Sequence, residues 1–315
     1  MSPVASVLDL IGNTPTVDIS ALSPNPRVAL LVKLEGQNPG GSIKDRVALS
    51  MVEALEKDGV LTEGATIMEP TSGNTGISLA LVAKVRGYRL VAVMADNTSR
   101  ERRELLEALG AEIIFTPGDE GSNGAVRRAE QLAVERPDLV FPYQYANPAN
   151  PEAHYYGTGP EIWHDSPELT HLVAGLGTGG TLVGAGRFLK EQNPSVQLWA
   201  VEPPSGESVA GLRNMDDGYV PAVFTDGGGP ELLDRRLIIQ PEASIEWSRR
   251  LLDQGILAGL STGAALAGAA RCSEEIDEGV IVVISADGAW KYLSSGAWSA
   301  DREAAADRLA QTTYF

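Results

Sequence analysis

Asn38-Pro39-Gly40-Gly41-Ser42-Ile43-Lys44-Asp45-Arg46 is the stretch that decides the fold, because it places one lysine beside a glycine pair. The glycines allow the backbone to approach a bulky planar group closely. Lys44 then begins a predicted helix that runs to Lys57, and partial desolvation there makes an amine nucleophilic. A Schiff-base lysine needs that environment, although a solvated charge is the commoner role at a helix start. Lys44 therefore needs support from other segments.

A second segment, Thr71-Ser72-Gly73-Asn74-Thr75-Gly76, lies between a strand-like run and an apolar run that continues to Val85. This order predicts a strand, a turn and a helix. Small hydroxyl and amide residues at a helix start offer side-chain and backbone donors to an anion. An ordinary N-cap needs one such residue, and this segment has four.

A third segment, Gly175-Leu176-Gly177-Thr178-Gly179-Gly180-Thr181, follows an apolar strand-like run and opens another helix. Its glycines also match G-x-G-x-x-G, with Glu202 at the end of the next predicted strand, which is close to a dinucleotide fingerprint. The hydroxyl groups of Thr178 and Thr181 fit a terminal phosphate monoester better than a diester. Both interpretations place a phosphate at a helix N-terminus.

A fourth segment, Gly259-Leu260-Ser261-Thr262-Gly263, matches the G-x-S-x-G turn of serine hydrolases. In such hydrolases the histidine follows the serine, whereas all three histidines of this chain precede Ser261. Ser261 is therefore better interpreted as a hydrogen-bond partner at a helix start. A hydroxyl in that position can face a ring nitrogen.

Taken together, these segments resemble the fold-type II pyridoxal-phosphate enzymes of the cysteine synthase family. The resemblance runs from Gly12-Asn13-Thr14-Pro15 through Ala286-Asp287-Gly288. It is closest to the O-phosphoserine-dependent cysteine synthases (cysteine synthase M type), through residues 212–221 and 157–161.

Strand-like and helix-like segments alternate along the chain, which predicts an α/β protein with parallel sheets. The predicted strands are Val28 to Leu34, Thr66 to Met68, Leu90 to Met94, Glu112 to Phe115, segments near Leu172 and Leu198, and Val280 to Ile284. The resemblance implies two parallel-sheet domains with pyridoxal 5'-phosphate in the cleft between them. Residues 38–145 would form the smaller domain. Residues 1–37 plus 146–315 would form the larger, cofactor-binding domain.

The resemblance also implies a role for each matched residue. Lys44 would be the catalytic residue, as both the Schiff-base partner of the cofactor and the general base. Arg213 would bind the phosphate of the substrate, with a salt bridge to Asp216 or Asp217 as the alternative. The remaining assignments are Asn74 to the ring oxygen of the cofactor, Gly177, Thr178, Gly179, Gly180 and Thr181 to its phosphate, Ser261 to its pyridine nitrogen, and Thr71, Ser72, Thr75 and Gln144 to the substrate α-carboxylate.

The implied activity is β-replacement, in which O-phospho-L-serine and a sulfur donor give L-cysteine through an α-aminoacrylate. The donor would be sulfide or a small thiocarboxylated carrier protein. An O-acetylserine sulfhydrylase that uses free sulfide is the alternative within this class, and cystathionine β-synthase chemistry is less favoured. A nucleotide-dependent oxidoreductase and an inactive cofactor-binding scaffold are the alternatives from other classes. In the phosphoserine-dependent subgroup a C-terminal tail, here residues 311–315, can cover the cleft.

Composition restricts the possible partners and the cellular location of the protein. The chain has 315 residues, a formal net charge of −17 and a single cysteine, Cys272. The negative charge argues against nucleic acid or an anionic membrane as a partner, and one cysteine suits a reducing compartment. No Lys or Arg precedes Arg27, so a signal peptide lacks its basic region. We expect a cytoplasmic homodimer that acts on a small amino acid, and we assign no residue to a metal site.

Overall fold

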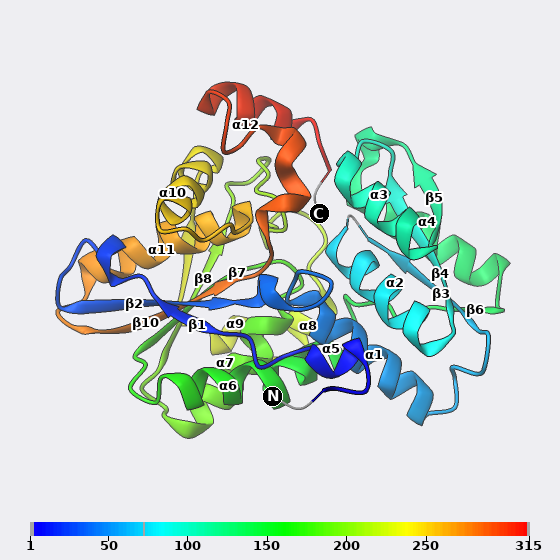
Figure 1. Cartoon of the computed structure of the whole chain (residues 1–315), viewed down its shortest axis with the longest axis horizontal. Helices are drawn as coiled ribbons and strands as arrows, with labels where there is room; N and C mark the ends of the chain where they lie inside the picture. The colour runs from blue at the N-terminus through cyan, green and yellow to red at the C-terminus, as the bar shows by residue number, and fades with distance from the viewer. Residues whose placement is uncertain (1–2, 72, 314–315) are drawn as a thin grey trace.

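The computed structural model describes residues 3–71 and 73–313, which form two α/β domains built on separate sheets (Figure 1). In the larger sheet β1 and β2 are antiparallel, and the other neighbouring strands are parallel. Its strands are, in order across the sheet, β1 (Thr16–Asp18), β2 (Val28–Leu34), β10 (Gly279–Ser285), β7 (His171–Gly175), β8 (Gln197–Glu202) and β9 (Arg235–Ile238).

The smaller sheet is parallel throughout the described residues. Its strands are, in order, β5 (Glu112–Thr116), β4 (Arg89–Ala95), β3 (Thr66–Pro70) and β6 (Leu139–Val140). The helices are α1 (Lys44–Lys57), α2 (Asn74–Arg86), α3 (Arg100–Leu109), α4 (Gly121–Glu135), α5 (Ala149–Ala153), α6 (Gly159–Asp165), α7 (Gly180–Gln192), α8 (Ala222–Thr225), α9 (Gly229–Leu232), α10 (Pro241–Asp253), α11 (Leu260–Glu275) and α12 (Arg302–Ala310).

Helices cover both faces of each sheet, as parallel strands require. In the larger sheet, Val173 of β7 packs toward α11 while its neighbour Leu172 packs toward α7. In the smaller sheet, Ala92 of β4 packs in the core formed with α1 and α2, and Val93 packs toward α4. Figure 1 shows α10 and α11 above the larger sheet and α6 and α7 below it. No helix in the described ranges is long and apolar enough to cross a bilayer.

The two domains are joined by backbone hydrogen bonds at the start of α1. The N–H of Ile43 donates to the carbonyl oxygen of Ala286, 2.8 Å away, directly after β10. Ser42 forms an isolated β-bridge with Asp287. Because parallel strands collect ligand-binding loops at their carboxyl ends, this connection brings Lys44 to the loop that follows β10.

A buried cluster of ion pairs also anchors α1. The guanidinium of Arg46 donates from Nε to Glu35 Oε2 at 2.7 Å and from Nη1 to Glu161 Oε1 at 2.7 Å. Glu35 is 0% exposed. Burial alone would raise the pKa of Glu161, but the hydrogen bonds and charge of Arg46 lower that pKa to about 2. Lys33 adds a second contact to Glu161 at 2.9 Å.

Replacing Arg46 with methionine is expected to reduce the free energy of unfolding by about 3–5 kcal/mol, because it leaves the buried Glu35 carboxylate without its positively charged partner. The measurement is a urea titration of the cofactor-free protein. The control is Arg86→Met, which removes an exposed ion pair with Glu53 and should cost less than about 1 kcal/mol. Equal, small losses in the two variants would contradict the role given to Arg46.

Candidate active site

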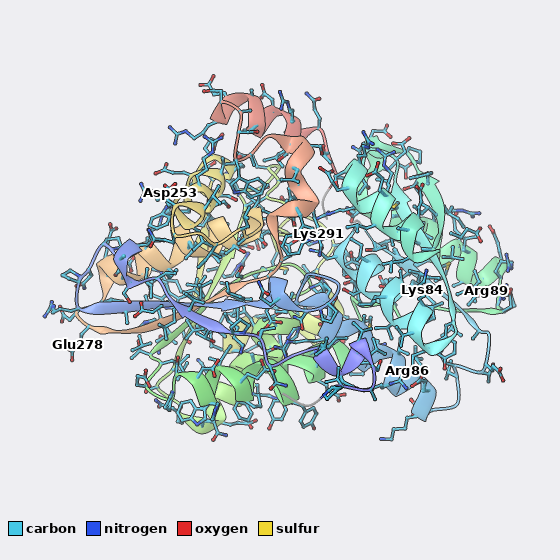
Figure 2. All side chains as sticks on the ribbon, in the orientation of Figure 1. Lys84, Arg86, Arg89, Asp253, Glu278 and Lys291 are labelled. Atoms are coloured by element: carbon cyan, nitrogen blue, oxygen red, sulfur yellow. The ribbon has the colours of Figure 1, made fainter. Side chains whose placement is uncertain are left out.

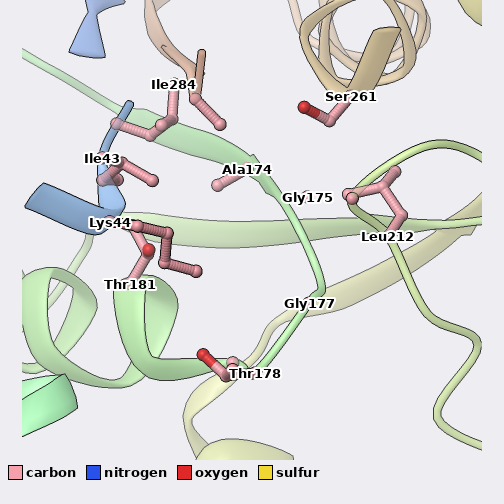
Figure 3. Close-up of a pocket in the computed structure, with 13 residues that line it drawn as sticks. Ile43, Lys44, Ala174, Gly175, Gly177, Thr178, Thr181, Leu212, Ser261 and Ile284 are labelled. Atoms are coloured by element: carbon pink, nitrogen blue, oxygen red, sulfur yellow. The ribbon is translucent and has the colours of Figure 1, made fainter. Parts of the chain in front are cut away.

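A cavity opens where β7 and β10 end, and three of the segments singled out from the sequence meet there. Figure 3 shows Lys44 at the start of α1 on one side and Ser261 at the start of α11 on the other, with the end of β7 between them. Gly177, Thr178 and neighbouring residues of the loop before α7 form the floor. Residues distant in the sequence thus line one site.

The amine of Lys44 is adapted to nucleophilic chemistry. Burial disfavours the ammonium form and lowers the pKa of Lys44 to about 8, although the carboxylate of Asp287 opposes this shift. A larger share of Lys44 is therefore neutral near pH 7 than for a solvated lysine. The sequence predicted this desolvation, but it did not identify Asp287 as the charge that moderates it.

The glycine loop before α7 has the form of an anion cradle. In the described part of the chain, no acceptor pairs with the N–H groups of Gly177, Thr178 and Gly179. Gly179 has a φ of +83°, and a Cβ on it would lie 2.6 Å from the Phe224 ring. The helix that follows places its positive end at this loop. The positive φ and the crowding by Phe224 explain the need for glycine at position 179.

Two buried residues that the sequence analysis missed support this loop from below. The Nδ2 of Asn150 donates to Thr178 Oγ1 at 3.1 Å, and a Cβ on Gly180 would lie only 2.1 Å from Asn150 Oδ1. His154 lies 3.3 Å from the hydroxyl of Thr181. Burial and the nearby positive charge of Lys44 lower the pKa of His154, which keeps the imidazole neutral beside the loop. Asn150 and His154 belong to no recognisable motif, so only the fold reveals them.

Ser261 occupies the second position of α11, and its side chain is largely buried but faces the cavity. Its hydroxyl has no hydrogen-bond partner among the described residues. None of the three histidines makes a hydrogen bond to Ser261 within the described ranges, which agrees with the rejection of the hydrolase interpretation. The geometry leaves this hydroxyl available to a ligand.

Asn74 is the first residue of α2 and lies outside the lining of the cavity in the described structure. Its Nδ2 donates to Asp287 Oδ2 at 2.7 Å, and its Oδ1 accepts from Lys291 Nζ at 2.8 Å. The amide therefore bridges the two domains. One N–H of Nδ2 remains for another acceptor.

The residues predicted to bind a carboxylate gather beside α2. The hydroxyl of Thr75 donates to Gln144 Oε1 at 2.7 Å, which leaves the side-chain NH₂ of Gln144 as the outward donor. Thr71 Oγ1 accepts the N–H groups of Gly73 and Gly76, so its own proton remains to donate. These side chains do not line the Lys44 cavity in the described structure, and Ser72 lies outside the described residues.

Glu69, at 0% exposed, holds the turn that carries Gln144. Its two carboxyl oxygens accept the backbone N–H groups of Tyr143 and Gln144 at 2.8 and 2.9 Å. Tyr143 has a φ of +56°, a region that non-glycine residues rarely adopt. Burial raises the pKa of Glu69 to about 8 although both N–H donors oppose that shift. Glu69 thus fixes a strained turn. Its position in the sequence, before Thr71, did not suggest this role.

Arg213 lines a larger cleft of about 1030 Å³ next to the cavity. Its backbone N–H donates to the carbonyl of Leu176 in the glycine loop at 2.7 Å. Its Nη1 donates to the carbonyl oxygen of Tyr219 at 3.0 Å. Of the two acids considered as alternative partners, Asp216 pairs with Arg236, and Asp217 accepts from Ser205 and the N–H of Gly206.

The structure also bears on the dinucleotide-binding hypothesis and on the role of the single cysteine. Glu202, the acidic residue of the dinucleotide interpretation, is buried and bonded to Arg236 and to the N–H of Met215, so it is not offered to a ribose. Cys272 is buried, and burial raises the pKa of its thiol to about 12, which leaves it unreactive at neutral pH. No group of three metal-ligating side chains occurs within the described ranges.

The donor set fits pyridoxal phosphate. Spare N–H groups and the Thr178 hydroxyl suit a phosphate, the Lys44 amine suits an aldehyde, and the Ser261 hydroxyl suits a ring nitrogen. Each of these groups faces the same cavity. The Thr178 hydroxyl oxygen accepts from Asn150 Nδ2 and from the N–H of Gly180, so its own proton is left to donate.

Comparison with known proteins agrees with this chemistry. Residues 7–287 match the model of the family described as pyridoxal-phosphate dependent enzyme. Cysteine synthase B of Pseudomonas aeruginosa is 42% identical over 294 residues, covering 93% of this chain and 97% of that protein. A solved O-ureido-L-serine synthase has a TM-score of 0.87 at 40% identity, covering 93% of this chain and 94% of that one.

An O-acetylserine-dependent cystathionine β-synthase from Helicobacter pylori is also similar, with a TM-score of 0.86 at 36% identity, covering 93% of this chain and 98% of that one. The chain therefore belongs to the pyridoxal-phosphate-dependent enzyme family. Within that family it is an enzyme of the cysteine synthase type and depends on pyridoxal phosphate.

At a pH above 8, where Glu69 is ionised, replacing it with glutamine is expected to raise the KM for the amino-acid substrate about five- to a hundredfold, because one buried backbone N–H would then face a donor. The turn that presents Gln144 would loosen as a result. The measurement is steady-state kinetics, with Glu63→Gln on the exposed segment before β3 as the control. An unchanged KM in a folded Glu69→Gln protein would show that Glu69 does not position the carboxylate site.

Proposed function

We propose that this protein makes L-cysteine from O-phospho-L-serine and a sulfur donor, by replacing the phosphate on the β-carbon. The observation that carries the choice of substrate is the position of Arg213 in the cleft beside the Lys44 cavity. Leu212, its neighbour in sequence, lines both spaces. O-acetylserine with free sulfide is the alternative pair of substrates, and the related proteins do not decide between the two.

Under this proposal the cofactor is held by the chain's own groups in the roles inferred from the sequence. The amine of Lys44 holds it covalently, Gly177 to Thr181 hold its phosphate, and Asn74 and Ser261 contact its ring. When bound, pyridoxal phosphate withdraws electrons from the α-carbon of the amino acid, which permits loss of a β-substituent. Ser261 offers the ring nitrogen a neutral hydroxyl rather than a carboxylic acid. Because a neutral hydroxyl does not protonate the ring nitrogen, the ring would be a weaker electron sink. A weaker electron sink would favour prompt elimination over transamination.

The rest of the proposal concerns the substrate. The released amine of Lys44 takes the α-proton as general base, for which a lowered pKa is suited. Thr71, Ser72, Thr75 and Gln144 orient the α-carboxylate, and hydroxyl and amide donors of the described members support this.

Arg213 would distinguish the leaving groups by charge. A phosphate monoester carries nearly two negative charges at neutral pH, and the planar guanidinium can bind it through two hydrogen bonds. An acetyl ester carries no charge and gains little from that contact. The strongly acidic chain repels anions overall, so a local cation is needed to hold a phosphorylated substrate.

Further features follow from the family resemblance and remain proposals. The sulfur donor is either sulfide or a thiocarboxylated carrier protein, and the cleft near Arg213 has room for an extended peptide end. Gln311, whose carbonyl accepts from Asn97 Nδ2 at 3.2 Å, supports a C-terminal tail at the cleft. Tyr314 and Phe315 lie outside the described residues.

We also propose domain limits of 38–145 for the smaller domain and 1–37 plus 146–315 for the larger. We propose in addition that the protein is a homodimer and that it is cytoplasmic. The buried free thiol of Cys272 suits a cytoplasmic location.

Replacing Arg213 with alanine is expected to separate the two candidate substrates. Loss of a charge-assisted, two-bond contact should cost about 2–4 kcal/mol with O-phosphoserine, which is roughly thirty- to a thousandfold in kcat/KM. The rate with O-acetylserine should change little. The measurement is cysteine formation from each substrate with sulfide, and Arg213→Lys tests whether charge without the planar fork suffices.

The comparison contains its own control, because damage to the fold would lower both rates equally. If both substrates lose the same factor, Arg213 does not select the leaving group, and the O-acetylserine alternative becomes the better proposal.

A further inference from the structure

A buried row of polar side chains crosses from the smaller domain to the larger one at Asn74. Asp287 and Lys291 follow β10 in the larger domain, and Lys291 lies between the two domains (Figure 2). Both are almost fully buried, at 1% and 0% exposed. Neither side chain received a role in the sequence analysis. Two buried charges beside a candidate cofactor site call for a physical reason, because burying a charge is costly unless it is paired.

The two charges hold opposite ends of the Asn74 amide. Lys291 Nζ donates to Asn74 Oδ1 at 2.8 Å and to the carbonyl oxygen of Gly41 at 2.9 Å. Asn74 Nδ2 donates to Asp287 Oδ2 at 2.7 Å. An ammonium only donates and a carboxylate only accepts. The amide is therefore fixed in one orientation, because a flipped amide would face a donor with its NH₂ and an acceptor with its oxygen.

Asp287 is held in turn by further buried groups. The hydroxyl of Tyr292 donates to Asp287 Oδ2 at 2.6 Å, and Arg102 Nη2 donates to the hydroxyl oxygen of Tyr292 at 3.0 Å. A Cβ on Gly259 would lie 2.0 Å from Asp287 Oδ1, so the segment before Ser261 closes over the carboxylate. Asp287 thus contacts both Asn74 and the segment that carries Ser261.

Lys291 also holds the glycine pair that precedes Lys44. Gly41 has a φ of +80°, and a Cβ on it would lie 2.7 Å from the Trp290 ring. The same ammonium therefore fixes the carbonyl of Gly41 and the amide of Asn74. A positioning role, rather than contact with the substrate, follows from this geometry, because Lys291 is enclosed by protein groups and does not line the cavity.

We propose that Asp287 and Lys291 are positioning residues that orient the Asn74 amide, so that its remaining N–H is directed to the ring oxygen of bound pyridoxal phosphate. The inference deepens the proposed function and rests on its assignment of Asn74 to the cofactor ring. Deletion of either partner frees the amide to rotate. The cofactor then loses a fixed donor although Asn74 is still present.

The test is a double-mutant cycle on cofactor affinity. Cofactor-free wild type, Lys291→Met, Asn74→Ala and the double variant are titrated with pyridoxal phosphate alone, and the dissociation constant is measured by equilibrium dialysis. Each single variant should weaken binding about tenfold or more. The loss in the double variant should be clearly smaller than the product of the two single losses, because Lys291 acts in part through Asn74 and in part through the carbonyl of Gly41. Lys57→Met, at the exposed end of α1, is the matched control and should bind like wild type.

Two results would overturn the inference. One is an unchanged affinity in Lys291→Met. The other is a loss in the double variant equal to the product of the two single losses, which would mean that Lys291 acts independently of Asn74. If Lys291→Met does not fold, Lys291→Gln, whose shorter neutral side chain cannot span the same contacts, replaces it in the same cycle. The titration contains no amino-acid substrate. Its result can therefore be interpreted even if the proposed cysteine synthesis is wrong.

Discussion

The segment Ala286-Asp287-Gly288 is the junction on which the site depends. The carbonyl of Ala286 accepts the N–H of Ile43, and the carbonyl of Asp287 accepts the N–H of Gly259. These two hydrogen bonds bring the helix starts that carry Lys44 and Ser261 to the end of β10. The Asp287 side chain adds a third connection, to Asn74. Three segments that are far apart in the sequence therefore share one short stretch of backbone.

The electrostatics of the site are set by nearby donor groups and not by the net charge of the chain. The chain is strongly acidic overall, yet the site offers backbone N–H groups, hydroxyls and the amine of Lys44, with the Asn74 amide and the buried Lys291 beside it. Burial lowers the pKa of both Lys44 and Lys291 to about 8, and Asp287 opposes the shift in each case. The geometry separates the two amines. Lys291 is committed to Asn74 and Gly41, whereas Lys44 lines the cavity and is bonded to no acceptor among the described residues.

The sequence predicted much of this because the local signals were strong. The helix from Lys44 to Lys57 and the strand from Val28 to Leu34 have the predicted limits, since glycine and polar residues bound clear apolar patterns. The short strands β1, β6 and β9 were not predicted, because two to four residues carry no periodicity. Glu69, Asn150 and Lys291 were missed for a different reason: each acts on a segment brought close only by the fold.

We propose that the cofactor is held by the amine of Lys44 and not by that of Lys291. The most direct measurement is reduction of the cofactor-loaded protein with borohydride, followed by proteolysis and mass spectrometry of the peptides. We expect one pyridoxyl group per chain, on the peptide that contains Lys44. A label on the peptide that contains Lys291, or labels spread over exposed lysines with Lys44 unmodified, would contradict it.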